Sequence, residues 1–290
     1  YYFPTTMRMS TVEVLKGAPL LRYGPQTTGG VINLVSTPIP EVYSGSITAV
    51  AGEYGSRDIN AHYGGKSGNF GWLVETVQRK SDGFKDIDRS DRDADFDIED
   101  YVVKLGWEGD KQRLLFKAQY SDEVSNETYL GLTDTDFDQD ENRRYGLSEI
   151  DQMDNKHEGY SLVYSLDLTD RITATTTAYY NEFTRDWFKL GGGGSIVSAA
   201  NTGDATAQGV LDGTVDATGL EYVHNNRSYE SQGVELNFAV DMDAHQLELG
   251  GRVHEDEMDR FQPIEVYDQI NGSLVFQNVV QPTGSNNRLE

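Results

Sequence analysis

Residues 160–181 read YSLVYSLDLTDRITATTTAYYN. On both sides of the link at residues 169–171, one set of alternate positions is mainly apolar and the other mainly polar or small. Alternate side chains of an extended chain share one face, so the pattern predicts two antiparallel strands joined by a tight turn. Each predicted strand has roughly nine to eleven residues, enough to cross a bilayer when tilted, whereas strands of soluble domains average ~5–6 residues.

The same alternation recurs along most of the chain, so we predict an all-β fold with about nine strands in view. The composition agrees, because 17 tyrosines and 30 glycines suit a chain of strands and turns. Inward rows that carry Lys104, Lys117, Asp167 and Arg252 fit a wet lumen, and the apolar rows fit contact with lipid. The further alternating segments are residues 45–52, 58–64, 70–80, 101–108, 114–120, 234–242 and 246–254.

The links between these segments differ in length in a regular way. Short links are expected at residues 66–69, 109–111, 169–171 and 242–244, and long polar links at 81–100, 122–158, 183–230 and from 256 onward. Only the link at 54–57 is short where a long one is due. Long loops at one end and short turns at the other are typical of outer-membrane barrels. The alternative is a soluble β-sandwich or sugar-binding surface adhesin with variable loops.

Composition and motifs exclude several classes of function. The net charge of −24 argues against nucleic-acid binding, which needs a basic face. The absence of cysteine excludes thiol chemistry, and the sequence contains no phosphate-binding loop, H-E-x-x-H or G-x-S-x-G motif. We therefore expect no enzyme. The chain starts without Met or a signal peptide, and an open barrel edge in lipid is unfavourable, so we expect a piece of a longer protein with further strands.

The first forty residues follow a different pattern. Residues 11–37 read TVEVLKGAPLLRYGPQTTGGVINLVST, which places short strands at 11–15 and 31–35 around turns rich in Gly and Pro. Pro38 and Pro40 then mark a stiff linker into the first long strand.

This stretch closely resembles the end of the plug domain of TonB-dependent outer-membrane receptors. The segment RYGPQ and the linker TPIP look most like the ferric citrate receptor subgroup, and residues 129–145 and 152–160 are similar to a long extracellular loop of that subgroup. The resemblance implies that residues 1–40 are the C-terminal part of the plug. It implies that residues 41–290 are the first part of a 22-stranded antiparallel transmembrane β-barrel with long extracellular loops.

The resemblance also implies a function without catalysis or a resident cofactor. Such a receptor is monomeric, lies in the outer membrane of a Gram-negative bacterium, contacts lipid and lipopolysaccharide, and is energised by periplasmic TonB. Its cargo is expected to be a ferric chelate, either ferric citrate or a related carboxylate siderophore. Cobalamin or an oligosaccharide on the same scaffold is the alternative. Lys16 matches the basic position that pairs with barrel carboxylates and locks the plug.

Candidate ligand residues follow from charge. Ferric citrate and siderophore complexes are usually anionic, and Arg binds carboxylates through two parallel hydrogen bonds. The alternative for the arginines of the long loop is charge balance against neighbouring acidic residues. The predicted ligand contacts are Arg22, Arg143, Arg144, Tyr145, Gln152, Asn155 and His157.

Two acidic runs suggest a calcium site. They place carboxylates at every second residue, so in an extended segment the carboxylates share one face and offer the hard oxygen ligands that Ca²⁺ prefers. The alternative is a solvated acidic loop bridged to lipopolysaccharide by divalent cations. The candidates are Asp91, Asp93 and Asp95 in the first run, and Asp134, Asp136 and Asp138 in the second.

Overall fold

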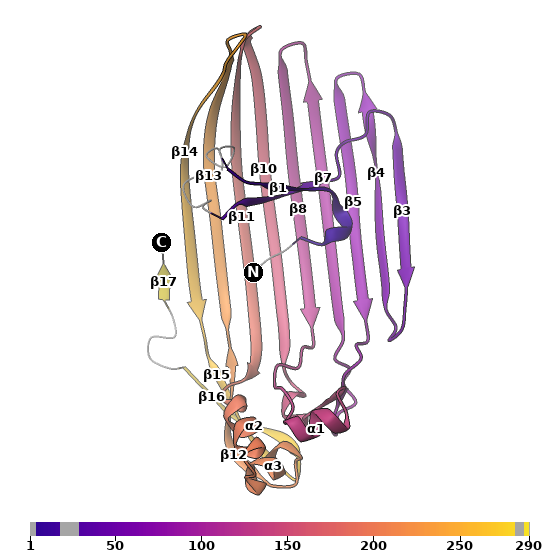
Figure 1. Ribbon diagram of the computed structural model, residues 1–290, viewed down its shortest axis with the longest axis vertical. Coiled ribbons are helices and arrows are strands. Elements are labelled where there is room, and N and C mark those ends of the chain that lie inside the picture. Colours follow the sequence, from indigo (N-terminus) through magenta and orange to yellow (C-terminus); the bar gives the residue numbers. More distant parts are fainter. Residues whose placement is uncertain (1–3, 18–28, 282–286, 290) are drawn as a thin grey trace.

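The computed structural model describes residues 4–17, 29–281 and, for their backbone alone, 287–289. A broad antiparallel sheet dominates the described part (Figure 1). Nine long strands follow one another through it in chain order, each paired with the next, so the predicted meander is confirmed. These nine form the wall. They are β3 (Ser44–Ala51), β4 (Arg57–Ser67), β5 (Phe70–Ser81), β7 (Phe96–Glu108), β8 (Gln112–Ser125), β10 (Gln152–Thr169), β11 (Ile172–Leu190), β13 (Asn226–Asp241) and β14 (Gln246–Phe261).

The strands of the wall are longer than predicted, and the predicted bounds of the long links were wrong. The links cover residues 82–95, 126–151 and 191–225, because strands such as β10 and β11 extend far beyond their apolar stretch. In these extensions polar residues occupy both faces, so an apolar–polar alternation cannot reveal them. The four short turns lie together at the opposite end of the wall (Figure 1).

The two faces of the wall differ as the alternation predicts. On β7, Tyr101, Val103 and Leu105 are exposed, while Asp100, Val102 and Lys104 on the other face are buried. The buried face is the inner face, because the N-terminal segment lies against it. The exposed face is the outer face, and it carries the apolar rows.

The N-terminal segment contains a 3-10 turn (Thr6–Arg8) and two strands, β1 (Met9–Leu15) and β2 (Val31–Ser36). β1 and β2 pair only with each other in the described part of the chain, forming an antiparallel sheet that crosses the wall (Figure 1). The predicted strands at 11–15 and 31–35 are therefore confirmed.

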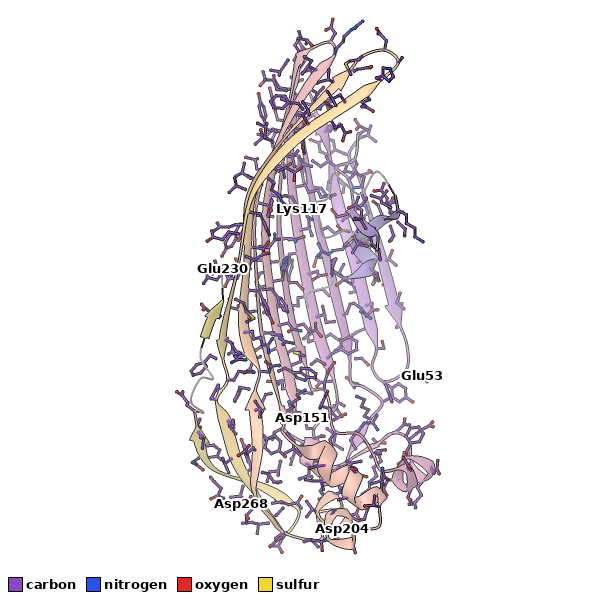
Figure 2. All side chains as sticks on the ribbon, turned by 60° about the vertical axis from the view of Figure 1, so that its left-hand side comes forward. Glu53, Lys117, Asp151, Asp204, Glu230 and Asp268 are labelled. Carbon is purple, nitrogen blue, oxygen red and sulfur yellow. The ribbon has the colours of Figure 1, made fainter. Side chains whose placement is uncertain are left out.

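The long links and the segment after β14 fold into a compact unit at one end of the wall, which we call the cap (residues 82–95, 126–151, 191–225 and 262–281). Figure 2 shows Asp204 and Asp268 within it and Lys117 midway along the wall. Its short elements are β6 (Asp86–Ile87), α1 (Asp134–Gln139), β9 (Arg143–Arg144), a 3-10 turn (Gly146–Ser148), α2 (Gly193–Asn201), α3 (Ala205–Leu211), β12 (Ala217–His224), β15 (Ile264–Ile270) and β16 (Ser273–Val280). β17 (Asn287–Leu289) pairs with β14.

The cap has its own hydrophobic core. At the start of two of its helices, a side chain accepts hydrogen bonds from backbone N–H groups of the first turn. Thr133 accepts from the N–H of Asp136 in α1, and Asp204 accepts from the N–H groups of Thr206 and Ala207 in α3. The core brings together links that are far apart in the sequence. Its buried residues are Leu130, Tyr145, Leu147, Leu190, Val210, Leu211, Leu220 and Tyr222.

Candidate functional site

Arg8 fastens the N-terminal segment to the inner face of the wall. Its Nε lies 3.4 Å from Oδ2 of Asp100 on β7, and its Nη1 donates to Oε1 of Gln119 on β8 at 3.4 Å. The Arg8 and Asp100 side chains are only 2% and 1% exposed. A buried cation needs a partner of opposite charge, so this pair fixes where the segment docks.

A second set of contacts holds the segment just after β2. The Thr37 hydroxyl donates to Oε1 of Glu75 at 2.9 Å, and the Lys104 ammonium donates to the Thr37 carbonyl oxygen at 2.5 Å. Asn60 also donates to Oε1 of Glu75, at 3.3 Å. The backbone N–H of Thr37 donates to the carbonyl of Arg8 at 3.3 Å, so the two attachments are joined. The β1–β2 unit is therefore held at the end where its chain enters and leaves.

Lys16, which was predicted to lock the plug, takes part in neither of these two attachments. Lys16 is exposed after the end of β1 and has no ion pair among the described residues. Arg22, a predicted ligand contact, lies outside the described residues. The basic residue that does meet a carboxylate of the wall is Arg8, which the sequence reasoning missed. The signal that could have found it is a single Arg close to the plug-like motif, facing a wall that carries Asp100 in its inward row.

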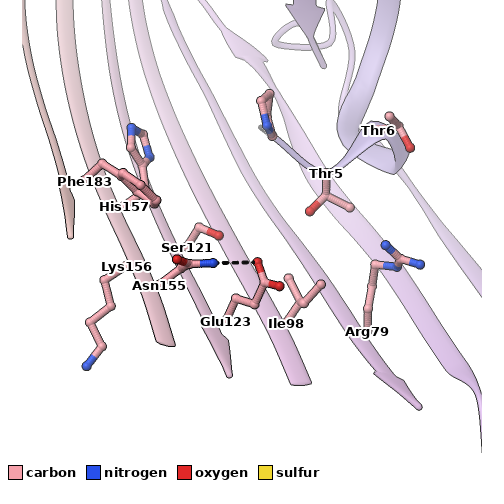
Figure 3. Close-up of a pocket in the computed structure, with 11 residues that line it drawn as sticks. Thr5, Thr6, Arg79, Ile98, Ser121, Glu123, Asn155, Lys156, His157 and Phe183 are labelled. Carbon is pink, nitrogen blue, oxygen red and sulfur yellow. Dashed lines mark hydrogen bonds between the residues drawn. The ribbon is translucent and has the colours of Figure 1, made fainter. Parts of the chain in front are cut away.

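A small cavity separates the start of the N-terminal segment from the wall (Figure 3). Pro4, Thr5 and Thr6 form one side of it, and residues of β5, β7, β8, β10 and β11 form the other. Asn155 and His157 line this cavity, so two of the predicted ligand residues come together here. Asn155 donates from Nδ2 to Oε2 of Glu123 at 3.3 Å, as Figure 3 shows.

The size of this cavity limits what it can hold. Its volume is about 200 Å³. Ligand pockets are usually ~300–1,000 Å³. The cavity is therefore smaller than a usual ligand pocket, and its residues suit contact with part of a ligand. Gln152 lies apart from it and donates to Oδ1 of Asn126 at 3.0 Å.

Arg143 is the centre of an ion-pair cluster inside the cap. Its guanidinium donates to Asp88 at 2.9 Å, Asp136 at 2.9 Å and Asp212 at 2.8 Å, three carboxylates from three different links. These hydrogen bonds, led by Asp88, raise the pKa of Arg143 above its ordinary value. Burial alone would raise the pKa of Asp136, but hydrogen bonds from Tyr145, Gln208 and Thr133 lower it. With its donors occupied, Arg143 holds the cap together rather than offering a site for a chelate.

The two residues that follow Arg143 also make hydrogen bonds within the cap, although Arg144 uses a single nitrogen, Nη1, and pairs with no carboxylate among the described residues. Arg144 donates to the carbonyl oxygens of Glu141 at 2.9 Å and Arg143 at 2.6 Å. Tyr145 is fully buried, and its hydroxyl donates to Asp136 at 2.6 Å. The structure therefore does not bring Arg143, Arg144 and Tyr145 together with Asn155 and His157. The charge-balance alternative describes Arg143 better.

The acidic runs do not form the expected calcium site. Residues 134–139 are helix α1, so Asp134, Asp136 and Asp138 do not share one face as they would in an extended strand. Asp136 is occupied by Arg143 and Tyr145. Residues 91–95 are irregular. Within the described residues, no three His, Asp or Glu side chains lie close enough together to hold a metal ion.

A belt of tyrosines crosses the outer face of four neighbouring strands. Each tyrosine hydroxyl donates to a carboxylate two residues further toward the cap on its own strand. From Tyr160 to Leu168 the outer row of β10 stays apolar over about 26 Å at ~3.3 Å per residue, close to the ~25 Å height of a barrel's apolar band. The pairs are Tyr101–Glu99 at 3.0 Å, Tyr120–Asp122 at 2.9 Å, Tyr160–Glu158 at 3.2 Å and Tyr180–Glu182 at 3.2 Å.

Such a belt marks a boundary between apolar and polar surroundings, because a tyrosine ring favours the first and its hydroxyl the second. The predicted apolar outward rows are therefore present on one face of the wall, and a row of tyrosines borders them on the side of the cap. Among the helices of the described residues, none has the length and apolar character needed to span a bilayer.

Comparison with solved structures identifies the architecture. The ferric citrate transporter FecA, in its unliganded form, matches with a TM-score of 0.65 and 17% identity over 97% of this chain. The siderophore receptor PiuA from Acinetobacter baumannii matches with a TM-score of 0.67 and 16% identity, also over 97% of this chain. The pyoverdine outer membrane receptor FpvA from Pseudomonas aeruginosa PAO1 matches with a TM-score of 0.60 and 14% identity over 96%.

This chain covers 38%, 38% and 41% of those three chains, so it spans well under half of their length. No protein-family model and no curated protein sequence matches the chain. Each of the three solved structures is described as a transporter or a receptor. The chain therefore has the fold of part of the β-barrel of such receptors, with an inner segment against the wall.

Proposed function

We propose that the chain is part of a TonB-dependent receptor of a Gram-negative outer membrane that takes up a ferric chelate. The observation that supports this best is the wall itself, apolar outside, polar inside and fastened to a separate segment by Arg8 and Asp100. Residues 1–40 would be the C-terminal part of the plug and residues 41–290 the first part of the barrel. The cap would lie outside the cell, above the tyrosine belt.

The cargo is proposed to be ferric citrate or a related carboxylate siderophore. The support is the resemblance of residues 11–37 to ferric citrate receptors and the match to a ferric citrate transporter. Cobalamin and oligosaccharides stay as alternatives on the same scaffold. In this proposal part of the cargo contacts the inner face near Asn155 and His157, because Arg143 is occupied within the cap.

Energy would come from TonB, which would act on the plug from the periplasm. The Arg8–Asp100 pair then holds the plug's tail while cargo is bound. Lys16 stays a predicted second lock, with a partner on strands that this chain does not contain. The outer rows would contact lipid and lipopolysaccharide.

Growth and uptake measurements test this proposal. A strain that lacks the whole receptor gene should lose uptake of ⁵⁵Fe-citrate and fail to grow with ferric citrate as sole iron source. Restoring the gene should restore both, and disabling TonB should abolish both again. Unchanged uptake of all iron chelates in the deletion strain would contradict the iron function. Extraction without detergent would contradict the membrane location.

A further inference from the structure

Two side chains at the cap end of β11 face the interior of the wall. Trp187 and Lys189 are separated by an even number of residues from Phe183, which lines the cavity behind the N-terminal segment. The pairing of β11 with β10 and then β12 shows no register shift in this stretch, so the three side chains share one face. At ~3.3 Å per residue, Lys189 lies about 20 Å further toward the cap than Phe183.

Lys189 is held between two aromatic rings. Its Nζ lies 3.3 Å from the ring centroid of Trp187 and 3.4 Å from that of Tyr129. The two rings are perpendicular, with centroids 4.9 Å apart. Tyr129 reaches this place from the link after β8, where its backbone N–H donates to Asp151 at 3.2 Å. The ammonium is therefore positioned in advance by cation–π contacts with one ring of its own strand, β11, and one ring of the link after β8.

No carboxylate of the described residues makes direct contact with the Lys189 ammonium. Within the described residues it has no ion pair, and the carboxylate that acts on it electrostatically, Asp151, accepts hydrogen bonds from the N–H groups of Tyr129 and Leu190. Arg185 also acts on Lys189 and adds positive charge on the same side of β11. In a chain with a net charge of −24, two cations that act on each other at the same side of a strand are unusual.

The chemistry of this place suits one class of ligand. Aromatic rings leave an ammonium its full charge and its capacity to donate to an anionic oxygen. Tyr129 is 57% exposed, so its ring also offers a flat surface to the carbon skeleton of a chelator. Carboxylate and catecholate oxygens share the required anionic character.

We infer that Tyr129, Trp187 and Lys189 form a contact site for the anionic oxygens of an iron chelate at the cap end of the barrel interior. This inference rests on the proposed function and deepens it, because it assigns the charge recognition to Lys189 rather than to Arg143.

The test uses the full-length receptor in detergent, with binding followed by quenching of tryptophan fluorescence. The probes are ferric citrate and the ferric complex of 2,3-dihydroxybenzoate, which are anionic, and an uncharged ferric trihydroxamate. The variants are Lys189→Met and Lys189→Arg. Lys156→Met is the matched control, because Lys156 is 53% exposed on the other face of β10 and pairs with Asp122. Heat-modifiable mobility on gels checks that each variant is folded.

Lys189→Met should weaken binding of an anionic chelate by about ten-fold or more, the scale of one hydrogen bond to a charged group. Lys189→Arg and Lys156→Met should bind the anionic chelates as the wild type does. A loss of affinity for ferric citrate indicates a carboxylate ligand, and a loss of affinity for the 2,3-dihydroxybenzoate complex indicates a catecholate ligand. Equal affinity of Lys189→Met and wild type, or binding of the trihydroxamate alone, would overturn the inference and leave the proposed function standing. If the wild type binds none of the three iron probes, both fall.

Discussion

Arg8 and Asp100 form an ion pair between the N-terminal segment and the inner face of the wall. Their side chains meet at 3.4 Å in a place almost closed to water, one from the N-terminal segment and one from the inner face of β7. Burying either charge alone would be unfavourable, so the pair stabilises the docked position of the N-terminal segment.

The first prediction concerns this pair. Asp100→Leu leaves the Arg8 guanidinium buried without its carboxylate, which should weaken docking by ~3–5 kcal/mol. Protease cleavage near residue 8 should then become much faster, while the mobility of the folded barrel stays unchanged. Adding Arg8→Met to Asp100→Leu should recover much of the protection.

Asp122→Asn serves as the control, because Asp122 pairs with a half-exposed Lys156 at 3.7 Å, and such surface pairs contribute ~0–1 kcal/mol. Equal protection of the Asp100→Leu variant and the wild type would show that the ion pair does not hold the segment.

The second prediction concerns the cap. Arg143→Met removes the cation that joins Asp88, Asp136 and Asp212, leaving three carboxylates close together. The links at 82–95, 126–151 and 191–225 should become sensitive to protease together, because one residue connects them. In the control Arg171→Met, an exposed pair with Asp243 at the short turns is lost, and no change is expected. Digestion of one link alone would contradict a shared cluster.

The third prediction concerns pH. Burial raises the pKa of Asp151 from 3.8 to about 7, against opposing hydrogen bonds from the N–H groups of Tyr129 and Leu190. The folded pKa is above the unfolded one, so the folded cap binds a proton more tightly. This contribution to stability is complete below pH ~4 and is lost as pH rises to about 7, at ~1.4 kcal/mol per unit.

Calorimetry of the cap transition should show a lower melting temperature at pH 7.5 than at pH 5 for the wild type. Asp151→Asn cannot titrate, so its melting temperature should change less over the same range. An equal shift in both proteins would assign the pH dependence to other groups.

The fourth prediction compares neighbours on β10. Leu162 lies on the outer face, on the side of the tyrosine belt that is away from the cap, and Val163 lies on the inner face. Leu162→Arg should destabilise the barrel in lipid vesicles by ~1–3 kcal/mol, since Leu162 lies about 7 Å inside the apolar band and the cost of Arg at the lipid face falls from ~2–4 kcal/mol at the midplane to ~0–1 at the edges. Val163→Arg should cost much less because it meets a wet interior. Denaturant titrations in vesicles measure both, and equal losses would contradict the assignment of faces.

The sequence predicts the wall well because lipid and lumen impose opposite demands on alternate residues. Tyr101, Val103 and Leu105 reveal their face through this alternation, and the tight turn at residues 169–171 fixes the register of its hairpin. The extensions of β10 and β11 beyond the tyrosine belt have polar residues on both faces, so no period marks them. Helix α1 is too short and polar to show a helical period.

The site was harder to predict because it depends on distant partners. Arg143 looks free for a ligand until Asp88 and Asp212 arrive from 55 and 69 residues away. Lys16 matches a familiar motif, yet the basic residue that is buried against the wall is Arg8, outside that motif. Lys189 gains its role only when Tyr129 folds over it.

The central claim is that the outer rows of the wall face hydrocarbon. These 290 residues contain no cysteine, so single cysteines at residues 160–168 can carry a nitroxide label once any cysteine elsewhere in the receptor is replaced by serine. In vesicles, electron paramagnetic resonance should show high exposure to oxygen at even positions and to a water-soluble nickel complex at odd positions. Nickel access at even and odd positions alike, or no period of two, would contradict the membrane barrel.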